Sequence, residues 1–148
     1  VYSTKSSNRK GAPNLFLTDG KNWMIQEILK DEVFGPMGLI VELEDVNEMF
    51  DIAKNLEGQL TCTIHFRNED ENITKKLIQI LERKAGRILA NGFPTGVEVA
   101  DAMVHGGPYP ASTNFGATSV GTLSIRRFLR PVCYQNMPHE FIKTIQTS

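Results

Sequence analysis

The sequence predicts an α/β fold in which a parallel sheet is built in the order strand, helix, strand, helix, strand (βαβαβ). Two observations support this prediction. Strand patterns at residues 39–43, 60–66 and 87–90 are separated by two stretches whose apolar residues recur with the period of a helix. Gly and Pro residues mark the boundaries of these stretches. Strands joined by helices in this way form a parallel sheet with right-handed crossovers.

The first helix of this pattern follows the strand at 39–43. Asp45 and Glu48 have the spacing of an Asp variant of the capping box, which places a helix start here. Gly58 stands where that helix is expected to end. An earlier, shorter strand is expected at 14–18. The apolar face of the helix would consist of Val46, Met49, Phe50, Ala53 and Leu56.

Alternation of apolar and polar residues predicts the strand at 60–66. Its two faces would be Leu60, Cys62, Ile64 and Phe66 on the apolar side and Thr61, Thr63 and His65 on the other. Asn68 with Glu71 opens a second helix, which Gly86 is expected to end. The third strand, 87–90, follows directly.

The pattern changes after Asn91. Residues 91–117 are rich in Gly and Pro and predict a long ordered loop containing a short helix. Residues 118–129 predict a further helix, ended by Pro131. Residues 132–135 are a candidate for a last strand.

Composition excludes several classes of function. The chain has 148 residues, which suffice for one core, and its net charge of −1 argues against a nucleic-acid-binding face. No apolar run approaches the roughly 20 residues that span a bilayer, so no membrane partner is expected. Two cysteines are too few for a disulfide framework. A cytoplasmic protein with reduced thiols is the expectation.

Neither cysteine is predicted to be a nucleophile. Cys62 shares the apolar face of a strand, which favours a core thiol, and Cys133 has no local signature of reactivity. A hydrolase built from Cys62, His105 and Asp101 would require an accessible thiol. No phosphate-binding glycine motif is present either.

A metal site is a second alternative to weigh. Glu98, Asp101 and His105 have spacings of three and four, which would place them on one face of a helix. Solvated polar residues show the same spacing, and Gly106 and Gly107 follow at once. The prediction is therefore that no metal is bound.

Three motifs carry a resemblance to a known family. Residues 31–36, DEVFGP, resemble the E-x-F-G-P motif of the aldehyde dehydrogenase superfamily. Residues 91–112 and 118–135 closely resemble its 2,5-dioxovalerate (α-ketoglutaric semialdehyde) dehydrogenase branch. The resemblance covers roughly residues 13–138, in the order of the family's C-terminal catalytic region.

The resemblance implies NAD or NADP as cofactor. In the family, the motif's glutamate accepts hydrogen bonds from the hydroxyls of the nicotinamide ribose, a role that falls to Glu32 here. Phe34 would pack beside the nicotinamide. The substrate would be a small aldehyde that enters along residues 91–112. The candidate entrance residues are Phe93, Thr95, Val97 and His105.

The resemblance also implies a division of the chain. Residues 1–12 would be a polar lead-in segment, and residues 13–130 part of an aldehyde dehydrogenase catalytic domain. Residues 131–148 would hold a C-terminal oligomerisation strand and tail, through which the protein forms a homo-oligomer. The parent protein would oxidise a carboxylate-bearing semialdehyde to its acid.

The family's chemistry requires residues that lie upstream of E-x-F-G-P: a nucleophilic cysteine, a glutamate base and a dinucleotide-binding domain. Only 31 residues precede Glu32, none of them cysteine, and the chain begins with Val1 rather than Met. A partial, inactive chain is therefore expected, removal of an initiator or tag being the alternative. The rival hypothesis is a stand-alone assembly module of the same fold.

Overall fold

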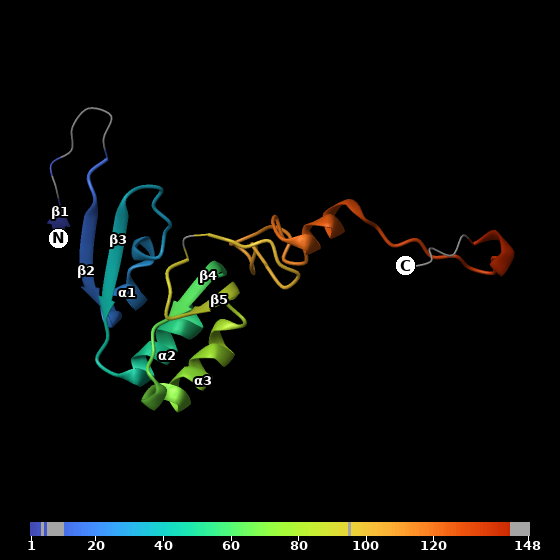
Figure 1. Cartoon of the computed structure of the whole chain (residues 1–148). Coiled ribbons are helices and arrows are strands. Elements are labelled where there is room, and N and C mark those ends of the chain that lie inside the picture. The colour runs from blue at the N-terminus through green and yellow to red at the C-terminus, as the bar shows by residue number, and fades with distance from the viewer. Residues whose placement is uncertain (4, 6–10, 95, 143–148) are drawn as a thin grey trace.

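The protein contains two small sheets. The structure is a computed structural model that describes residues 1–3, 5, 11–94 and 96–142. In the first sheet, β1 (Tyr2–Ser3) pairs antiparallel with β2 (Asn14–Asp19), and β2 pairs parallel with β3 (Met37–Glu42). In the second, β4 (Gln59–Ile64) pairs parallel with β5 (Ala85–Ala90). The α/β class is confirmed (Figure 1).

The helices lie between the strands along the chain. Helix α1 (Gly20–Ile25) and the 3-10 turn η1 (Glu27–Leu29) connect β2 to β3, and α2 (Val46–Asn55) connects β3 to β4. The turn η2 (Asn68–Asp70) leads into α3 (Glu71–Leu81), which connects β4 to β5. Two further 3-10 turns follow, η3 (Thr122–Phe128) and η4 (His139–Phe141).

The pairing of the strands differs from the single parallel sheet that was predicted. The elements β3, α2, β4, α3 and β5 occur in the predicted order. However, β3 pairs with β2 and β4 pairs with β5, so the described residues form two separate ladders. Alternation within a strand identifies the face that it buries, but not the neighbour that takes its backbone hydrogen bonds.

The start of α2 was predicted correctly. The Asp45 carboxylate accepts hydrogen bonds from the backbone N–H groups of Asn47 at 2.7 Å and Glu48 at 2.9 Å. The Glu48 side chain accepts from the backbone N–H of Glu44 rather than that of Asp45. The predicted end is wrong, because the helix ends at Asn55 with Leu56 as its C-cap. Gly58 instead lies against the backbone of Pro108.

Replacing Asp45 by alanine is expected to destabilise the fold in a pH-dependent way. Hydrogen bonds from the backbone N–H groups of Glu48 and Asn47 hold the pKa of the Asp45 carboxyl below its ordinary value of 3.8. The contribution of the carboxylate is therefore full above pH 3.8 and is lost as the pH falls through the lower pKa of the folded state. Urea unfolding at several pH values should show the gap between wild type and Asp45→Ala closing in acid. Asp51→Ala, which loses only an exposed ion pair with Lys54, is the control.

The core lies where α2 and α3 cover one face of the β4–β5 sheet. Its buried members are Ala53 of α2, Ile64 of β4, and Leu77 and Leu81 of α3. Cys62 and Phe66 of the predicted apolar face pack against them, whereas Leu60 is 40% exposed. Helix α3 ends at Leu81 and not at Gly86, which instead belongs to β5.

The chain beyond β5 contains less regular structure than predicted. Residues 96–117 contain turns but no helix, and residues 118–129 form only the 3-10 turn η3. Side-chain hydroxyl groups here occupy backbone carbonyls that an α-helix would use for its own hydrogen bonds. Ser124 Oγ donates to the Gly121 carbonyl at 2.7 Å, and Thr118 Oγ1 donates to that of Val120 at 2.9 Å.

The segment after η3 extends away from the body (Figure 1). Residues 132–135 form no strand ladder with the described residues of this chain. Within the described part of the chain, no helix has the length and apolar character needed to cross a membrane.

Candidate cofactor and substrate cleft

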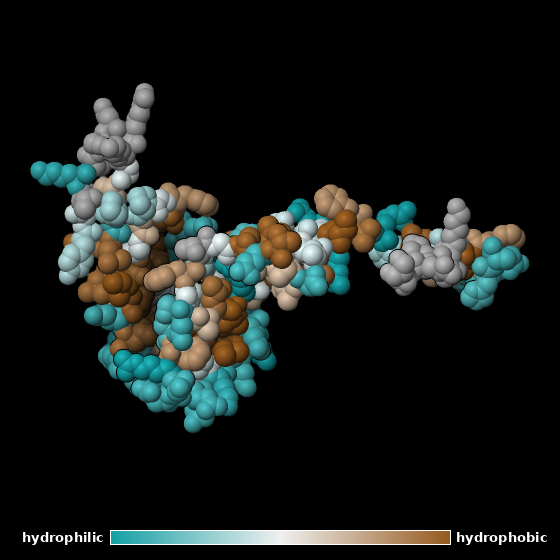
Figure 2. Space-filling view, in the orientation of Figure 1, coloured by the Kyte–Doolittle hydropathy of each residue, from teal (hydrophilic) through white to brown (hydrophobic). Residues whose placement is uncertain are grey.

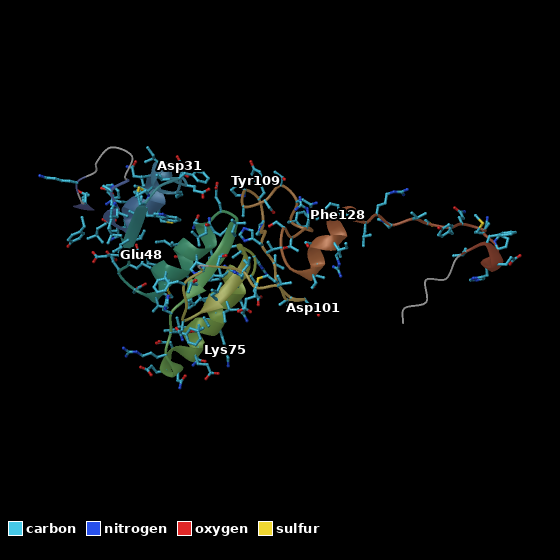
Figure 3. The ribbon with its side chains drawn as sticks, turned by 45° about the horizontal axis from the view of Figure 1, so that its top comes forward. Asp31, Glu48, Lys75, Asp101, Tyr109 and Phe128 are labelled. Carbon is cyan, nitrogen blue, oxygen red and sulfur yellow. The ribbon has the colours of Figure 1, made fainter. Side chains whose placement is uncertain are left out.

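A cleft of about 700 Å³ lies between the turn that precedes β3 and the β4–β5 sheet. One wall is the turn before β3, which carries Lys30, Asp31 and Glu32. The floor comes from the first residues of β4 and from Arg87 of β5, and the other wall from the loop that contains His105. Figure 3 labels Asp31 on the first wall and Tyr109 on the loop. A hollow of about 770 Å³ beside β1 has no charged side chain among its lining residues.

Close backbone contacts position the loop. A Cβ atom on Gly86 would overlap the carbonyl group of Gly106, and one on Gly58 would overlap the carbonyl of Pro108. Only glycine allows the loop to approach the starts of β4 and β5 so closely. The run Gly106-Gly107-Pro108 therefore lies against neighbouring backbone, and Gly58 and Gly86 are the residues that it approaches.

Thr118 fixes the position of His105. The buried Thr118 hydroxyl accepts a hydrogen bond from the backbone N–H of His105 at 2.8 Å. The backbone N–H and the hydroxyl of Ser119 both donate to the His105 carbonyl. The imidazole Nδ1 is buried and has no hydrogen-bond partner among the described residues. The ring is therefore held at the cleft by its backbone.

Two of the predicted site residues, Glu32 and His105, line this cleft. Phe34 does not line it and is 94% exposed. Phe93 is 79% exposed and lies with its ring centroid 5.8 Å from that of His65. Val97 is at the surface, outside the lining of the cleft. Thr95 lies outside the described residues.

Sequence reasoning missed Arg87. This residue stands beside Thr61 in the β4–β5 register, so both lie on the face of the sheet opposite the core. Its Nη1 group donates to the carbonyl of Gly96 at 2.6 Å. The available signal was a single arginine within the otherwise apolar strand AGRILA.

Cys62 is confirmed as a core thiol. It packs against the cluster of Ile64, Leu77 and Leu81, and burial raises the pKa of its thiol. Because Cys62 faces the core and His105 lines the cleft on the opposite side of the sheet, the two cannot form a catalytic pair. The Cys62–His105–Asp101 hydrolase is thereby ruled out.

Alkylation should distinguish the two cysteines. Cys133 is exposed, whereas the thiolate of Cys62 is disfavoured by burial. We expect iodoacetamide at mildly alkaline pH to modify Cys133 at least roughly tenfold faster than Cys62. Peptide mass spectrometry after timed quenching measures both rates, and unfolding in urea should make them converge. Equal rates in the native protein would contradict the placement of Cys62.

The helical face proposed for a metal site does not form. Glu98, Asp101 and His105 lie in irregular chain, and Asp101 Oδ1 accepts a hydrogen bond from Thr122 Oγ1 at 2.8 Å. No group of three or more His, Cys, Asp or Glu side chains with metal-binding geometry occurs among the residues that the structure describes. The helical spacing that prompted the metal hypothesis was misleading.

Comparison with known proteins identifies relatives of this chain, although no family model matches it. It is 48% identical over 128 residues to "Alpha-ketoglutaric semialdehyde dehydrogenase 2" of Azospirillum brasilense, covering 86% of this chain and 24% of the relative. It is 56% identical over 108 residues to "Alpha-ketoglutaric semialdehyde dehydrogenase" of Acinetobacter baylyi, covering 73% of this chain and 20% of the relative. The chain thus spans a fifth to a quarter of these relatives, and its resemblance to the aldehyde dehydrogenase superfamily is confirmed.

Proposed function

We propose that this chain is part of an NAD(P)-dependent aldehyde dehydrogenase that oxidises a small carboxylate-bearing semialdehyde to its acid. The observation that carries the proposal is that Glu32 and His105 line the same cleft, although they come from distant segments. The relatives named above act, by name, on α-ketoglutaric semialdehyde. The cleft volume of about 700 Å³ falls within the range of small-molecule sites.

Glu32 has the properties required to hold a nicotinamide ribose. Its side chain is exposed at the cleft and forms no ion pair with any described residue. A carboxylate is an acceptor only, so it can take hydrogen bonds from both hydroxyls of a vicinal diol. A bound NAD or NADP would supply the hydride acceptor for aldehyde oxidation. Phe34, which is close to Glu32 in sequence, remains a proposed neighbour of the nicotinamide.

The aldehyde entrance is proposed along the loop that carries Phe93, Thr95, Val97 and His105. The position of His105 in the cleft, which Pro94 also lines, supports an entrance along this loop. None of the described residues that line the cleft is a cysteine. We therefore propose that the thiol that attacks an aldehyde in this chemistry is supplied by residues outside this chain, and that the chain alone is inactive.

A homo-oligomer is proposed through residues 132–135. Val132 and Tyr134 are 55% and 59% exposed, and this segment has no strand partner in the described chain. An extended segment of this kind suits addition to the sheet of a partner subunit. Apolar side chains also gather on the middle of the body, whereas hydrophilic side chains cover its lower end (Figure 2). The two unpaired cysteines suit a reducing, cytoplasmic environment.

The accessible area supports further protein contacts. The chain exposes 12330 Å², whereas a compact monomer of 16.5 kDa exposes about 7,500 Å². This excess also favours the rival proposal, an assembly module without catalysis. The open reading frame that encodes the chain separates the two. A length close to that of the relatives supports the enzyme, and a length close to 148 codons supports the module.

The enzymatic proposal is tested on the product of that open reading frame. Aldehyde-dependent NAD(P)H formation from α-ketoglutaric semialdehyde is expected, and Glu32→Gln should raise the KM for the cofactor about tenfold because a charged acceptor is lost. Glu82→Gln, an exposed substitution after α3, is the matched control. Absence of turnover with both NAD and NADP would overturn the proposed function.

A further inference from the structure

Arg87 is a cation whose donors are largely unused. The structure gives its guanidinium one hydrogen bond within the described residues, from Nη1 to the Gly96 carbonyl at 2.6 Å. Its Nε atom is buried and has no hydrogen-bond partner there. No described carboxylate forms an ion pair with it. A guanidinium offers five N–H donors, and leaving the buried Nε–H without a partner is unfavourable.

The other basic side chain of the cleft is already engaged. Lys30 Nζ donates to Glu27 at 2.7 Å and to the Met24 carbonyl at 3.4 Å, and it lies 5.2 Å from the centroid of the Trp23 ring. Asp31, Glu32 and Glu57 also line the cleft, but none of them neutralises Arg87. Of the described cleft residues, Arg87 is therefore the cation free to bind an anion.

We propose that Arg87 binds the carboxylate of the substrate and so determines the preference for aldehydes that carry a keto-acid group. The planar fork of a guanidinium matches a carboxylate with two parallel hydrogen bonds. A 2-keto acid adds a ketone oxygen beside the carboxylate as a further acceptor. This inference rests on the proposed function for the identity of the substrate, which is the one the relatives are named for.

Because Arg87 donates a hydrogen bond to the Gly96 carbonyl, it could serve only to hold the loop. This structural role has to be distinguished from recognition of the substrate carboxylate. If Arg87 only anchored the loop, its replacement would weaken all ligands of the cleft alike. If Arg87 recognises a carboxylate, the loss is confined to ligands that carry one. The test is therefore the difference between a charged and a neutral ligand of the same shape.

Binding to the full 148-residue chain provides the first test. NMR titration compares 2-oxopentanoate, a keto acid with five carbons, with the neutral ketone 2-pentanone. We expect the keto acid to shift the signals of Arg87 and Gly96, and Arg87→Gln to weaken its binding at least tenfold. Arg87→Lys should lose part of the affinity, and the exposed Arg83→Gln none. No binding of 2-oxopentanoate by the wild type, or equal binding by Arg87→Gln, would overturn the proposal.

Kinetics of the open-reading-frame product provide the second test. Arg87→Gln should lower kcat/KM for α-ketoglutaric semialdehyde at least about tenfold while leaving that for pentanal close to wild type. Equal losses of kcat/KM for both aldehydes would show that Arg87 only holds the loop, and would overturn the proposal. If neither aldehyde is oxidised, the proposed function fails. The titration then still decides whether Arg87 forms a carboxylate site.

Discussion

Gly86→Ala is expected to detach the 105–111 loop from the β4–β5 sheet and to destabilise the protein by about 2 kcal/mol or more. A Cβ at this position would overlap the carbonyl group of Gly106. The overlap is not easily relieved, since the Gly106 carbonyl belongs to the backbone and Gly86 lies inside a paired strand. The loop has to move, and with it His105 leaves the cleft.

Urea unfolding and amide hydrogen exchange measure this effect. The loop amides should lose protection in Gly86→Ala, together with the fall in unfolding free energy. Gly35→Ala is the matched control, because a Cβ there meets no atom within 4 Å. If Gly86→Ala and Gly35→Ala had the same stability and the same loop protection, the close contact between Gly86 and the Gly106 carbonyl would not position the loop.

Leu77→Ala is expected to lower the free energy of unfolding by about 2–5 kcal/mol, the range for truncating a buried leucine. Leu77 is 8% exposed and belongs to the cluster formed by Ala53, Ile64 and Leu81. Its removal leaves a cavity between α3 and β4 that backbone cannot fill. In a core with so few buried residues, the loss is a large part of the total stability.

Chemical denaturation followed by circular dichroism checks this prediction. Ile28→Ala removes an aliphatic side chain of the same size from a position that is 76% exposed, and it should change stability by no more than about 0.5 kcal/mol. Similar losses for Leu77→Ala and Ile28→Ala would show that α3 does not cover the sheet as described.

Local patterns predicted the elements of the fold but not their pairing. The core face of Cys62, Ile64 and Phe66 and the Asp45 cap were predicted correctly, because side-chain periodicity and capping depend on residues near in sequence. The strand itself is shorter than predicted and ends at Ile64, and Leu60 is exposed. The separation of β3 from β4 depends on backbone pairing between distant segments, which leaves no periodic trace. The helix expected at 118–129 failed because Ser and Thr hydroxyls there bond to local backbone carbonyls.

The candidate site was predictable only in part. The motif resemblance selected Glu32 and His105, which the structure places in one cleft. Gly58 and Gly86 were interpreted as helix ends. In the sequence, a glycine that allows another backbone segment to approach closely cannot be distinguished from a glycine that ends a helix. Arg87 was missed because the contacts of one charged residue in a strand are set by the tertiary structure.

We propose that this chain supplies part of a semialdehyde dehydrogenase site whose nucleophile comes from elsewhere in the protein. The most direct measurement is NAD(P)H formation by the purified 148-residue chain with α-ketoglutaric semialdehyde and NAD or NADP. The described residues that line the cleft include no cysteine, and Cys62 is half-buried against the core, so no formation above the protein-free blank is expected. Aldehyde-dependent turnover by the chain alone, retained after replacement of both cysteines by serine, would contradict this account.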